Sequence, residues 1–335
     1  MYTEDKILSE NNKKESIMKN IRFGIIGAGN IANKFCDAAK LADGAEVCAV
    51  ASKSMERAQA FAERNGIAKA YDSYEEMLKT EDIDAVYIAT THNFHMENIR
   101  LCFEYGKHVL CEKAMVLTAD DAREIFRLAK EKNLFCMEAM WSNFLPQTQK
   151  AKEWITSGAI GEIQSVSAVI GFNGGENPES RLYNPALAGG AMYDIGVYPV
   201  EIVSYLVGEP IEDCIGVWRP HAVTGVDERV SFIVRYASCD AAIQTVLTSN
   251  AREYTIINGS KGCIELPWSS SGYVAKRYDG RRQLAETYED RFENGFVFEI
   301  EEVVRCINEG KITSDIMPPE ATIQCAELFD KLLRG

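Results

Sequence analysis

Residues 21–32 read IRFGIIGAGNIA, a short apolar run followed by a glycine-rich turn and the start of a helical pattern. In such a turn Gly27 permits a tight bend and Gly29 lets the backbone approach a pyrophosphate, while alanine replaces the third glycine of the dinucleotide-binding fingerprint. The amide groups of Asn30 and Ile31, at the expected helix start, would then face the phosphates. A chance glycine-rich turn is the alternative, and the flanking strand and helix weigh against it.

Short apolar runs alternate with helix-length amphipathic segments as far as about residue 142. Apolar strands that follow one another through helices are typical of a parallel sheet covered on both faces. The expected strands are 21–27, 46–52, 85–90, 108–112 and 134–138, and the expected helices include 32–41, 55–65 and 119–132. The sequence therefore predicts an α/β protein whose first domain, residues 21–142, is a doubly wound, dinucleotide-binding Rossmann fold.

The pattern changes after residue 142, where a helix is expected over 147–157 and a long strand over 162–172. Further strands follow on turn-length connections, at 229–236, 241–248, 253–258 and 263–266, and helices are expected at 296–309 and 319–333. Consecutive strands on tight turns form antiparallel pairs. We therefore expect residues 143–335 to form an α+β, substrate-binding domain with a large, open, mostly antiparallel sheet.

Residues 1–20 are rich in lysine and glutamate and lack apolar periodicity. Segments of this kind rarely bury enough apolar surface to fold by themselves, so a polar extension ahead of the first domain is expected. Met18 is a candidate second start site. N-terminal mass spectrometry of the native protein would reject that hypothesis if every chain begins at Met1.

The chain of 335 residues carries 36 basic and 50 acidic side chains, a formal net charge of −14. Such a field repels phosphate backbones and anionic lipid headgroups, so neither nucleic acid nor a membrane surface is expected as a partner. The ten cysteines lie on apolar segments without paired CxxC spacing, which is typical of buried, reduced thiols. With no apolar run near the ~20 residues that span a bilayer, we expect a cytoplasmic protein.

The cofactor preference is indicated by the end of the second expected strand. There, about 20 residues after the glycine-rich turn, NAD enzymes carry an acidic residue for the ribose 2′-hydroxyl. This chain instead offers Ser52, Lys53 and, one helical turn further, Arg57, a hydroxyl and two cations that suit a 2′-phosphate. NADP is therefore favoured, and NAD stays possible if Lys53 and Arg57 form only a solvated helix face.

Two further stretches carry residues that suit hydride-transfer chemistry. Glu112 and Lys113 end an expected strand, at the carboxyl edge of the sheet where ligands bind in doubly wound folds. A lysine beside a nicotinamide can lower the pKa of a neighbouring acid or orient a substrate oxygen. An exposed loop charge is the alternative for Lys113.

The second stretch, residues 188–199, reads AGGAMYDIGVYP. On an α-helix Asp194 and Tyr198 would share one face, so that a carboxylate and a phenol project into one cleft. Pro199 must either kink that helix or lie in its first turn. A capping aspartate and a structural tyrosine are the alternative.

Several ordered motifs together resemble the Gfo/Idh/MocA (glucose-fructose oxidoreductase/inositol dehydrogenase) family from about residue 21 to the C-terminus. They are GAGNIA (27–32), CEK (111–113), EAMW (138–141), SGAIGEI (157–163) and GGAMYDIGVY (189–198). The chain is most similar to the dimeric dihydrodiol dehydrogenase and NADP-dependent D-xylose dehydrogenase branch of that family. The likeness to this branch lies around Arg181–Pro185 and in Tyr198, where many relatives carry histidine.

The resemblance implies a catalytic role for Lys113 beside the nicotinamide, an acid/base role for Tyr198 and an orienting role for Asp194. It also implies that Glu112 lies near the nicotinamide and that Trp141 lies at the cofactor and substrate cleft. By the same resemblance, the open sheet of the second domain forms the surface of a homodimer or a higher homo-oligomer.

The chain departs from the family in two places. Ala114 stands where the family has the proline of its glutamate-lysine-proline motif, and Thr91 replaces the usual proline after the fourth strand. The cofactor contacts expected from the loop that begins there are Thr90, Asn93 and His95.

These observations favour an NADP-dependent oxidoreductase that acts on a sugar, a polyol or a trans-dihydrodiol. Tyr198, assisted by Lys113, would move the hydroxyl proton while a hydride passes between the substrate carbon and the nicotinamide. A non-catalytic NAD(P)-binding sensor is the alternative, since Rossmann folds also serve regulators. His92 and His95 would suit a metal hydrolase only with a third ligand nearby, and no metal is expected.

Overall fold

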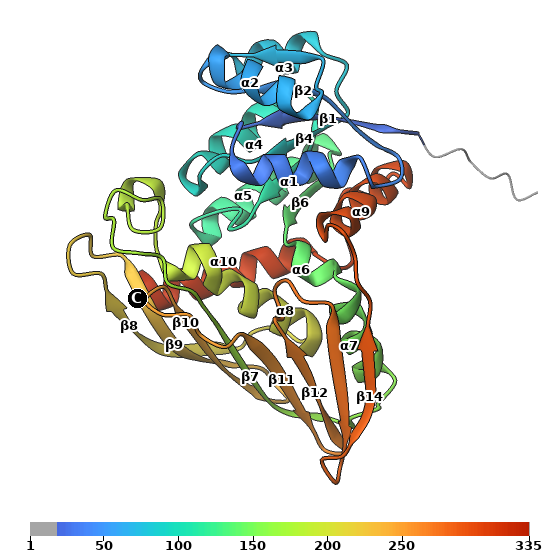
Figure 1. Ribbon diagram of the computed structural model, residues 1–335, viewed down its shortest axis with the longest axis vertical. Helices are drawn as coiled ribbons and strands as arrows, with labels where there is room; N and C mark the ends of the chain where they lie inside the picture. The colour runs from blue at the N-terminus through green and yellow to red at the C-terminus, as the bar shows by residue number, and fades with distance from the viewer. Residues whose placement is uncertain (1–18, 335) are drawn as a thin grey trace, which may run out of the picture.

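The computed structural model describes residues 19–334, which form a six-stranded and an eight-stranded sheet (Figure 1). In Figure 1 the first sheet and its helices lie above the second sheet, which forms a broad layer at the base of the molecule, with helices between the two. The predicted polar extension falls almost wholly on residues 1–18, and the candidate start at Met18 falls there too, outside the described residues.

The first sheet is parallel throughout, in the order β3-β2-β1-β4-β5-β6, which confirms the doubly wound prediction. Its strands are β1 (Ile21–Ile26), β2 (Ala45–Ala51), β3 (Lys69–Tyr71), β4 (Ala85–Ile88), β5 (His108–Glu112) and β6 (Cys136–Ala139). The connecting helices are α1 (Asn30–Ala39), α2 (Met55–Asn65), α3 (Tyr74–Thr80), α4 (His95–Glu104) and α5 (Ala119–Lys132). The strand order reverses between β1 and β4, and ligands of such folds bind in the crevice outside that point.

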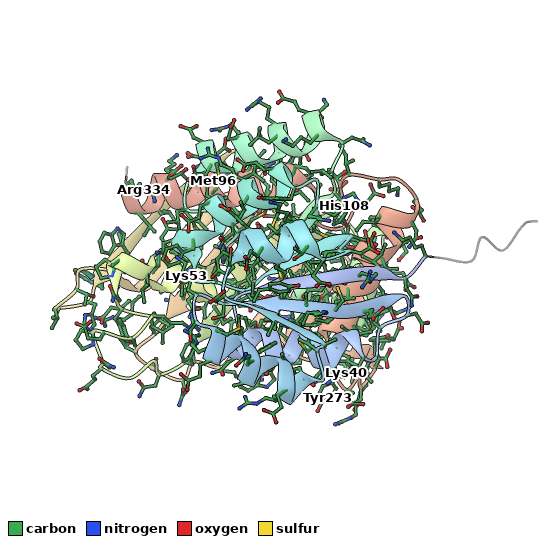
Figure 2. All side chains as sticks on the ribbon, turned by 90° about the horizontal axis from the view of Figure 1, so that it is seen from above. Lys40, Lys53, Met96, His108, Tyr273 and Arg334 are labelled. Atoms are coloured by element: carbon green, nitrogen blue, oxygen red, sulfur yellow. The ribbon has the colours of Figure 1, made fainter. Side chains whose placement is uncertain are left out.

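The direction of these strands can be followed from above (Figure 2). They run from the side marked by His108, the first residue of β5, to the side marked by Lys53, just after β2. Strand β1 is buried on both faces, with Phe23 and Ile25 in one apolar cluster and Ile26 in the other. Because both faces are covered, the strand ends are left as the open side of the sheet.

The second sheet has the order β14-β13-β12-β11-β7-β10-β9-β8 and is antiparallel except where β7 and β10 pair in parallel. This confirms a mostly antiparallel sheet, whereas the expectation that each strand pairs with the next is wrong where β10 inserts beside β7. The strands are β7 (Ile163–Gly171), β8 (Asp213–Pro220), β9 (Asp227–Arg235), β10 (Asp240–Val246), β11 (Tyr254–Gly259), β12 (Gly262–Pro267), β13 (Val274–Asp279) and β14 (Leu284–Glu289).

Helices of the second half cover the inner face of that sheet and also reach the first sheet. They are α6 (Trp141–Phe144), α7 (Pro146–Thr156), α8 (Val197–Val207), α9 (Phe296–Asn308) and α10 (Pro319–Arg334). Helix α9 packs against α1, and α10 packs against both α5 and α8. None of the helices in residues 19–334 combines the length and the apolar character that crossing a membrane requires.

Helix α10 is tied to both halves of the chain by hydrogen bonds. Arg334 donates to the carbonyl oxygen of Leu117 at 3.0 Å and to the hydroxyl of Tyr193 at 2.9 Å. The hydroxyl of Thr322 donates to Glu138 at 2.7 Å, inside the core. The C-terminal helix is therefore part of the packing of the first sheet as well as of the second.

Helix α9 carries two glutamates in opposite situations. Glu299 is fully buried, and neither carboxylate oxygen has a hydrogen-bond partner among the described residues. Burial, with a smaller contribution from the nearby Glu112, raises its pKa well above 4.5. Burial also acts to raise the pKa of Glu302, but its bonds to Arg305 and Ser314 outweigh burial and lower that pKa.

These two residues are expected to respond oppositely to replacement by methionine. The folded protein keeps a proton on Glu299 that the unfolded chain releases, so its presence costs stability as the pH rises above about 4.5. Glu299→Met should raise the free energy of unfolding at pH 8 by about 1–3 kcal/mol. Glu302→Met should lower it by about 2 kcal/mol, and that loss should shrink as the pH falls below 4.5. Urea unfolding at pH 5 and pH 8 measures both, and destabilisation by Glu299→Met would contradict the account.

Candidate active site

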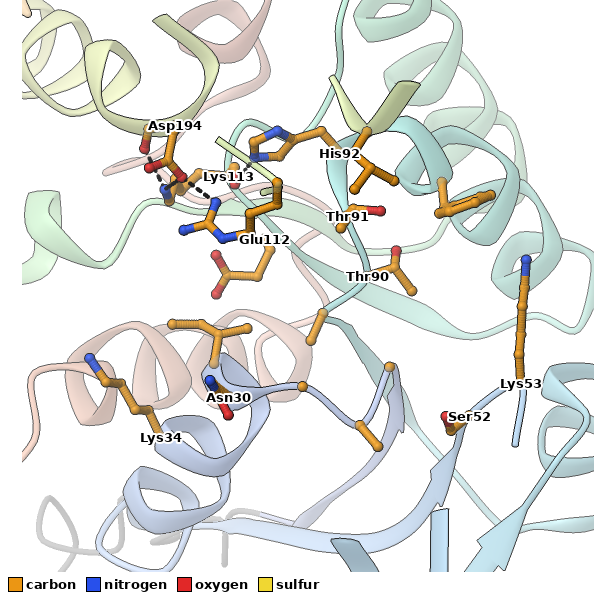
Figure 3. Close-up of a pocket in the computed structure, with 18 of the residues that line it drawn as sticks. Asn30, Lys34, Ser52, Lys53, Thr90, Thr91, His92, Glu112, Lys113 and Asp194 are labelled. Carbon is orange, nitrogen blue, oxygen red and sulfur yellow. Dashed lines mark hydrogen bonds and ion pairs between the residues drawn. The ribbon is translucent and has the colours of Figure 1, made fainter. Parts of the chain in front are cut away.

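A cavity of about 700 Å³ lies at the carboxyl ends of the first sheet and reaches the segment before α8 (Figure 3). It collects most of the residues that the sequence singles out. Those on its wall are Gly27, Gly29, Asn30, Ile31, Ser52, Lys53, Arg57, Thr90, Glu112, Lys113, Asp194 and Tyr198. Asn93, His95 and Trp141 are not on the wall.

The glycine-rich turn leaves space for a ligand above the start of α1. Gly27 has a φ of +105°, and a Cβ there would lie 2.8 Å from the carbonyl carbon and oxygen of Ala89, so no other residue fits without displacing the backbone. Gly29 precedes α1, and no side chain caps the first turn of that helix. Its free amide groups can therefore donate to a phosphate, so this turn fits the pyrophosphate of a dinucleotide.

One end of the cavity is cationic. Figure 3 shows Ser52 and Lys53 on the far side of the cavity from Lys113 and Asp194. The Lys53 ammonium lies 4.3 Å from the centre of the Phe94 ring, and within residues 19–334 neither Lys53 nor Arg57 forms an ion pair. Two uncompensated cations beside the buried Ser52 hydroxyl fit the 2′-phosphate of NADP.

The other end of the cavity holds the three predicted catalytic side chains. Lys113 Nζ donates to the backbone oxygen of Asp194 at 2.6 Å and lies 3.7 Å from its carboxylate Oδ1. The same ammonium lies 4.7 Å from the centre of the Tyr198 ring. Trp141 Nε1 donates to the Tyr198 hydroxyl at 3.3 Å, so Trp141 contacts Tyr198 from behind the wall. The prediction that these groups meet in one cleft agrees with this geometry.

The charges of the cluster are set by mutual contact. Burial acts to lower the pKa of Lys113, but Tyr198, Asp194 and Glu112 outweigh burial and raise that pKa, so the amine stays protonated. Burial acts to raise the pKa of Asp194, but Lys113 and Arg181 outweigh it and the carboxyl stays ionised. Burial raises the pKa of Tyr198, and Lys113 opposes that rise in part. A phenol held beside an ammonium can both give up and regain a proton.

Glu112 lies on the wall beside Lys113 and accepts a hydrogen bond from the Tyr87 hydroxyl. Burial raises its pKa, although Lys113 and the bond from Tyr87 act to lower it. The peptide bond between Lys113 and Ala114, where the family has its proline, is cis.

The segment that carries Asp194 and Tyr198 differs from the single α-helix expected there. Met192–Gly196 is π-helical and α8 begins at Val197, so Pro199 lies in the first turn of α8. The amide of Met192 donates to the buried Asp227 at 2.8 Å, which fixes the start of the segment. Both side chains face the cavity despite the changed helix type.

The two histidines after β4 form hydrogen bonds to the backbone, and His92 also lies on the cavity wall. The ring nitrogens of His95 lie 3.0 Å from the oxygen of Ala114 and 3.1 Å from that of Thr90. Those of His92 lie 3.2 Å and 3.3 Å from the oxygens of Lys113 and Ala188, and burial lowers its pKa to about 3. His95 is fully buried and does not lie on the cavity wall, and its expected contact with the cofactor stays a prediction.

Asn93, the other expected contact in this loop, accepts a hydrogen bond from the Thr91 hydroxyl at 2.8 Å. Sequence reasoning named Arg181 only as part of a motif and gave it no role, although it lies on the wall and bonds directly to Asp194. Lys34, Tyr74 and Leu187 also lie on the wall and were not singled out from the sequence. Of these residues, only Lys34 could have been expected from the sequence, because it stands one helical turn after Asn30 and therefore on the same helix face.

Two family models match the chain. One is described as "Oxidoreductase family, NAD-binding Rossmann fold" and matches residues 21–140, and the other is described as "GFO/IDH/MocA C-terminal domain" and matches residues 148–265. Together they span most of the chain and include the glycine-rich turn, Lys113, Asp194 and Tyr198.

Similar proteins are named as dehydrogenases or reductases. Trans-1,2-dihydrobenzene-1,2-diol dehydrogenase of Mus musculus is 33% identical over 325 residues, covering 93% of this chain and 95% of that protein. D-xylose 1-dehydrogenase (NADP(+)) of Hypocrea jecorina is 32% identical over 357 residues, covering 94% and 91%. KijD10, a 3-ketoreductase from Actinomadura kijaniata whose crystal structure holds TDP-benzene and NADP, superposes with a TM-score of 0.82 at 25% identity, covering 95% and 98%.

These matches confirm the resemblance that the ordered motifs indicate. They extend across both sheets, and the relatives above 30% identity cover nearly the full chain. The chain belongs to the Gfo/Idh/MocA family of oxidoreductases.

Proposed function

We propose that this oxidoreductase transfers a hydride between NADP and a hydroxyl or carbonyl carbon of a sugar, a polyol or a trans-dihydrodiol. The observation that carries the proposal is the contact of Lys113 with both Asp194 and Tyr198 at one end of a cavity that begins at the glycine-rich turn. In this proposal residues 21–142 bind the cofactor, and residues 143–335 bind the substrate and form the dimer surface.

Different residues of the cavity wall would bind different parts of NADP. Gly27 and Gly29 leave room for the pyrophosphate, whose oxygens would accept bonds from the amides of Asn30 and Ile31. The 2′-phosphate would be held by Ser52, Lys53 and Arg57, and the nicotinamide end by Thr90 and Glu112. When bound, the cofactor supplies the hydride acceptor or donor.

Tyr198 carries the proton in this mechanism. In oxidation its deprotonated oxygen takes the proton of a substrate hydroxyl, and in reduction the phenol returns that proton to the forming alkoxide. The Lys113 ammonium stabilises the phenolate, while Asp194 holds that ammonium through its backbone oxygen. Trp141 fixes the direction of the Tyr198 hydroxyl.

The substrate class rests on the names of the relatives and on the chemistry of the wall. The two relatives compared above are named for a dihydrodiol and for D-xylose, both of which present neighbouring hydroxyl groups. Asp194 and Arg181 can bond to such hydroxyls, and Phe172 and Leu187 offer apolar surface to a ring. We therefore favour a small molecule with at least two adjacent hydroxyl groups.

The test is titration of the purified protein with NADP and with NAD, followed by a screen of aldoses, polyols and trans-diols for absorbance of the reduced cofactor. Preferred binding of NADP and turnover of one substrate class would support the proposal. Binding without turnover of any hydroxyl substrate would favour the sensor alternative. Absence of binding would contradict both.

We further propose that the protein works in the cytoplasm. All ten cysteines are free thiols, and nine of them are buried. Free, buried thiols are usual where the thiol pool is kept reduced.

The outer face of the second sheet supports the proposed dimer. Ile215 and Val217 of β8 are 71% and 72% exposed, and Ile233 of β9 is 46% exposed, beside a shallow hollow that they help to line. Apolar side chains gathered on one face mark an interaction surface. A flat sheet that meets its own copy through a two-fold axis buries such a face on both subunits.

We expect the double change Ile215→Asp and Ile233→Asp to convert the dimer to a monomer. Each aspartate would be buried without a partner in the interface, at a cost of several kcal/mol for the pair. Sedimentation velocity of the two proteins measures the change. Leu41→Asp, at a residue that is 45% exposed after α1, is the matched control and should leave the oligomeric state unaltered. A dimer that survives the double change would contradict this interface.

A further inference from the structure

Arg181 is held at the cavity by the segment between β7 and α8. Its side chain is 57% exposed on the cavity wall, and its Nη1 donates to Asp194 Oδ1 at 2.5 Å. The segment is fixed close by, because Tyr183 is fully buried and donates to the oxygen of Leu247 at 3.1 Å. The amide of Gly190 also donates to the oxygen of Leu182 at 2.9 Å. The guanidinium is therefore presented to Asp194 by ordered backbone.

Two cations, Arg181 and Lys113, lie near the Asp194 carboxylate. Oδ1 lies 2.5 Å from Arg181 Nη1 but 3.7 Å from Lys113 Nζ, which is beyond hydrogen-bond distance. Lys113 instead donates to the Asp194 backbone oxygen and faces the Tyr198 ring. The third titratable group that faces Asp194 is His92, whose ring is neutral because burial lowers its pKa to about 3.

We propose that Arg181 is a positioning residue that occupies the Asp194 carboxylate, so that the Lys113 ammonium is left to face Tyr198. The inference rests on the proposed function, because it concerns the residue that moves the proton. In this inference the guanidinium determines whether the Lys113 ammonium pairs with the Asp194 carboxylate or faces Tyr198. A contact with substrate alone would not require that role.

Removal of the guanidinium has a definite electrostatic consequence. A buried carboxylate must be paired, so Asp194 would turn to Lys113 and shorten their ion pair, now 3.7 Å long, to a direct hydrogen bond. Tyr198 would then lose part of the cation beside it, while Glu112 and Asp194, the carboxyls that face it, would stay in place. The loss of positive charge beside unchanged carboxyls favours the phenol over the phenolate.

The experiment compares the pH dependence of kcat for Arg181→Gln with that of the unaltered enzyme, with NADP and substrate saturating. The limb that reports the Tyr198 proton, on which oxidation accelerates as the pH rises, should move to higher pH by about 1 unit. Oxidation at pH values below this limb should then slow by about tenfold. Arg181→Lys should keep the limb near its original position, because an ammonium can also pair with Asp194. Arg127→Gln, which removes an exposed arginine from an ion pair on α5, should leave the profile unchanged.

Other outcomes would overturn the inference. A loss of kcat in Arg181→Gln with an unmoved limb would mean that the residue has only a structural or substrate-binding role. An equal shift in Arg181→Lys and Arg181→Gln would also contradict it, because charge would then not be the cause. A failure of the proposed function is recognised separately, by full turnover in Tyr198→Phe.

Discussion

Replacement of Tyr198 by phenylalanine should lower kcat by about 10²-fold or more in both directions of the reaction. The change removes a single oxygen, the one that accepts the hydrogen bond from Trp141 and lies on the ring faced by Lys113. The ring and its packing stay, so the fold and the cavity are preserved. Steady-state rates with saturating NADP and substrate measure the loss, and the limb on which oxidation accelerates with rising pH should disappear with the phenol.

Tyr193→Phe is the matched control for this change. Its hydroxyl bonds to Arg334 and to the oxygen of Leu117, outside the cavity wall, so kcat should stay within about twofold of the original value. The dissociation constant for NADP should be unaltered in both variants, because neither tyrosine approaches the cationic end of the cavity. Unchanged turnover in Tyr198→Phe would remove that residue from the acid/base role.

Replacement of Lys53 and Arg57 by alanine should weaken NADP binding by about 10²-fold or more. Each lost hydrogen bond to a charged phosphate costs about 1.5–3 kcal/mol of binding free energy. Within the described chain neither Lys53 nor Arg57 forms an ion pair with a carboxylate. The affinity for NAD should change little, since NAD has no 2′-phosphate. Calorimetric titration of the double variant with both cofactors measures the two affinities.

Arg64→Ala, in the last turn of the same helix α2, is the control for this pair. Arg64 is not on the cavity wall, so both affinities should stay as they are. An equal loss of NADP and NAD affinity in the double variant would mean that the two cations do not read the 2′-phosphate. Retention of full NADP affinity would contradict the assignment of this end of the cavity.

The first sheet was predictable because its signals are local. Helices α2 and α5 begin and end at the expected residues, since each has a capping side chain before it and a left-handed residue after it. The glycine-rich turn specifies its own backbone geometry, as Gly27 demonstrates by its φ of +105°. Strand β3 was missed because three half-exposed residues carry no pattern.

The second sheet was predictable only in type. Its parallel pair of β7 and β10 joins residues about 75 positions apart, and such a pairing leaves no local signal. Strand β8 was missed because its apolar residues Ile215 and Val217 point outward, so the usual alternation does not report a buried face. Strands β13 and β14 are half-exposed and polar, and they resemble loops in sequence.

The residues of the site were predictable where a side chain suited to the chemistry stands at the end of a strand. Lys113 directly follows β5, and Asp194 and Tyr198 stand four apart, so pattern and spacing made them candidates and the family resemblance gave them their roles. Arg181 was left without a role because its contact with Asp194 depends on how the segment after β7 folds back. For His95 the sequence could not separate a residue that touches the cofactor from one that supports the wall from behind.

Helix α10 has a consequence for how the molecule can move. A polypeptide that crossed between the two sheets once would let them swing about a hinge at that crossing. Here Arg334 bonds to Leu117 on one side and to Tyr193 on the other, and Thr322 bonds to Glu138, so swinging would break the contacts of α10 on at least one side. The cofactor end and the catalytic end of the cavity are therefore held in one frame by the C-terminal helix.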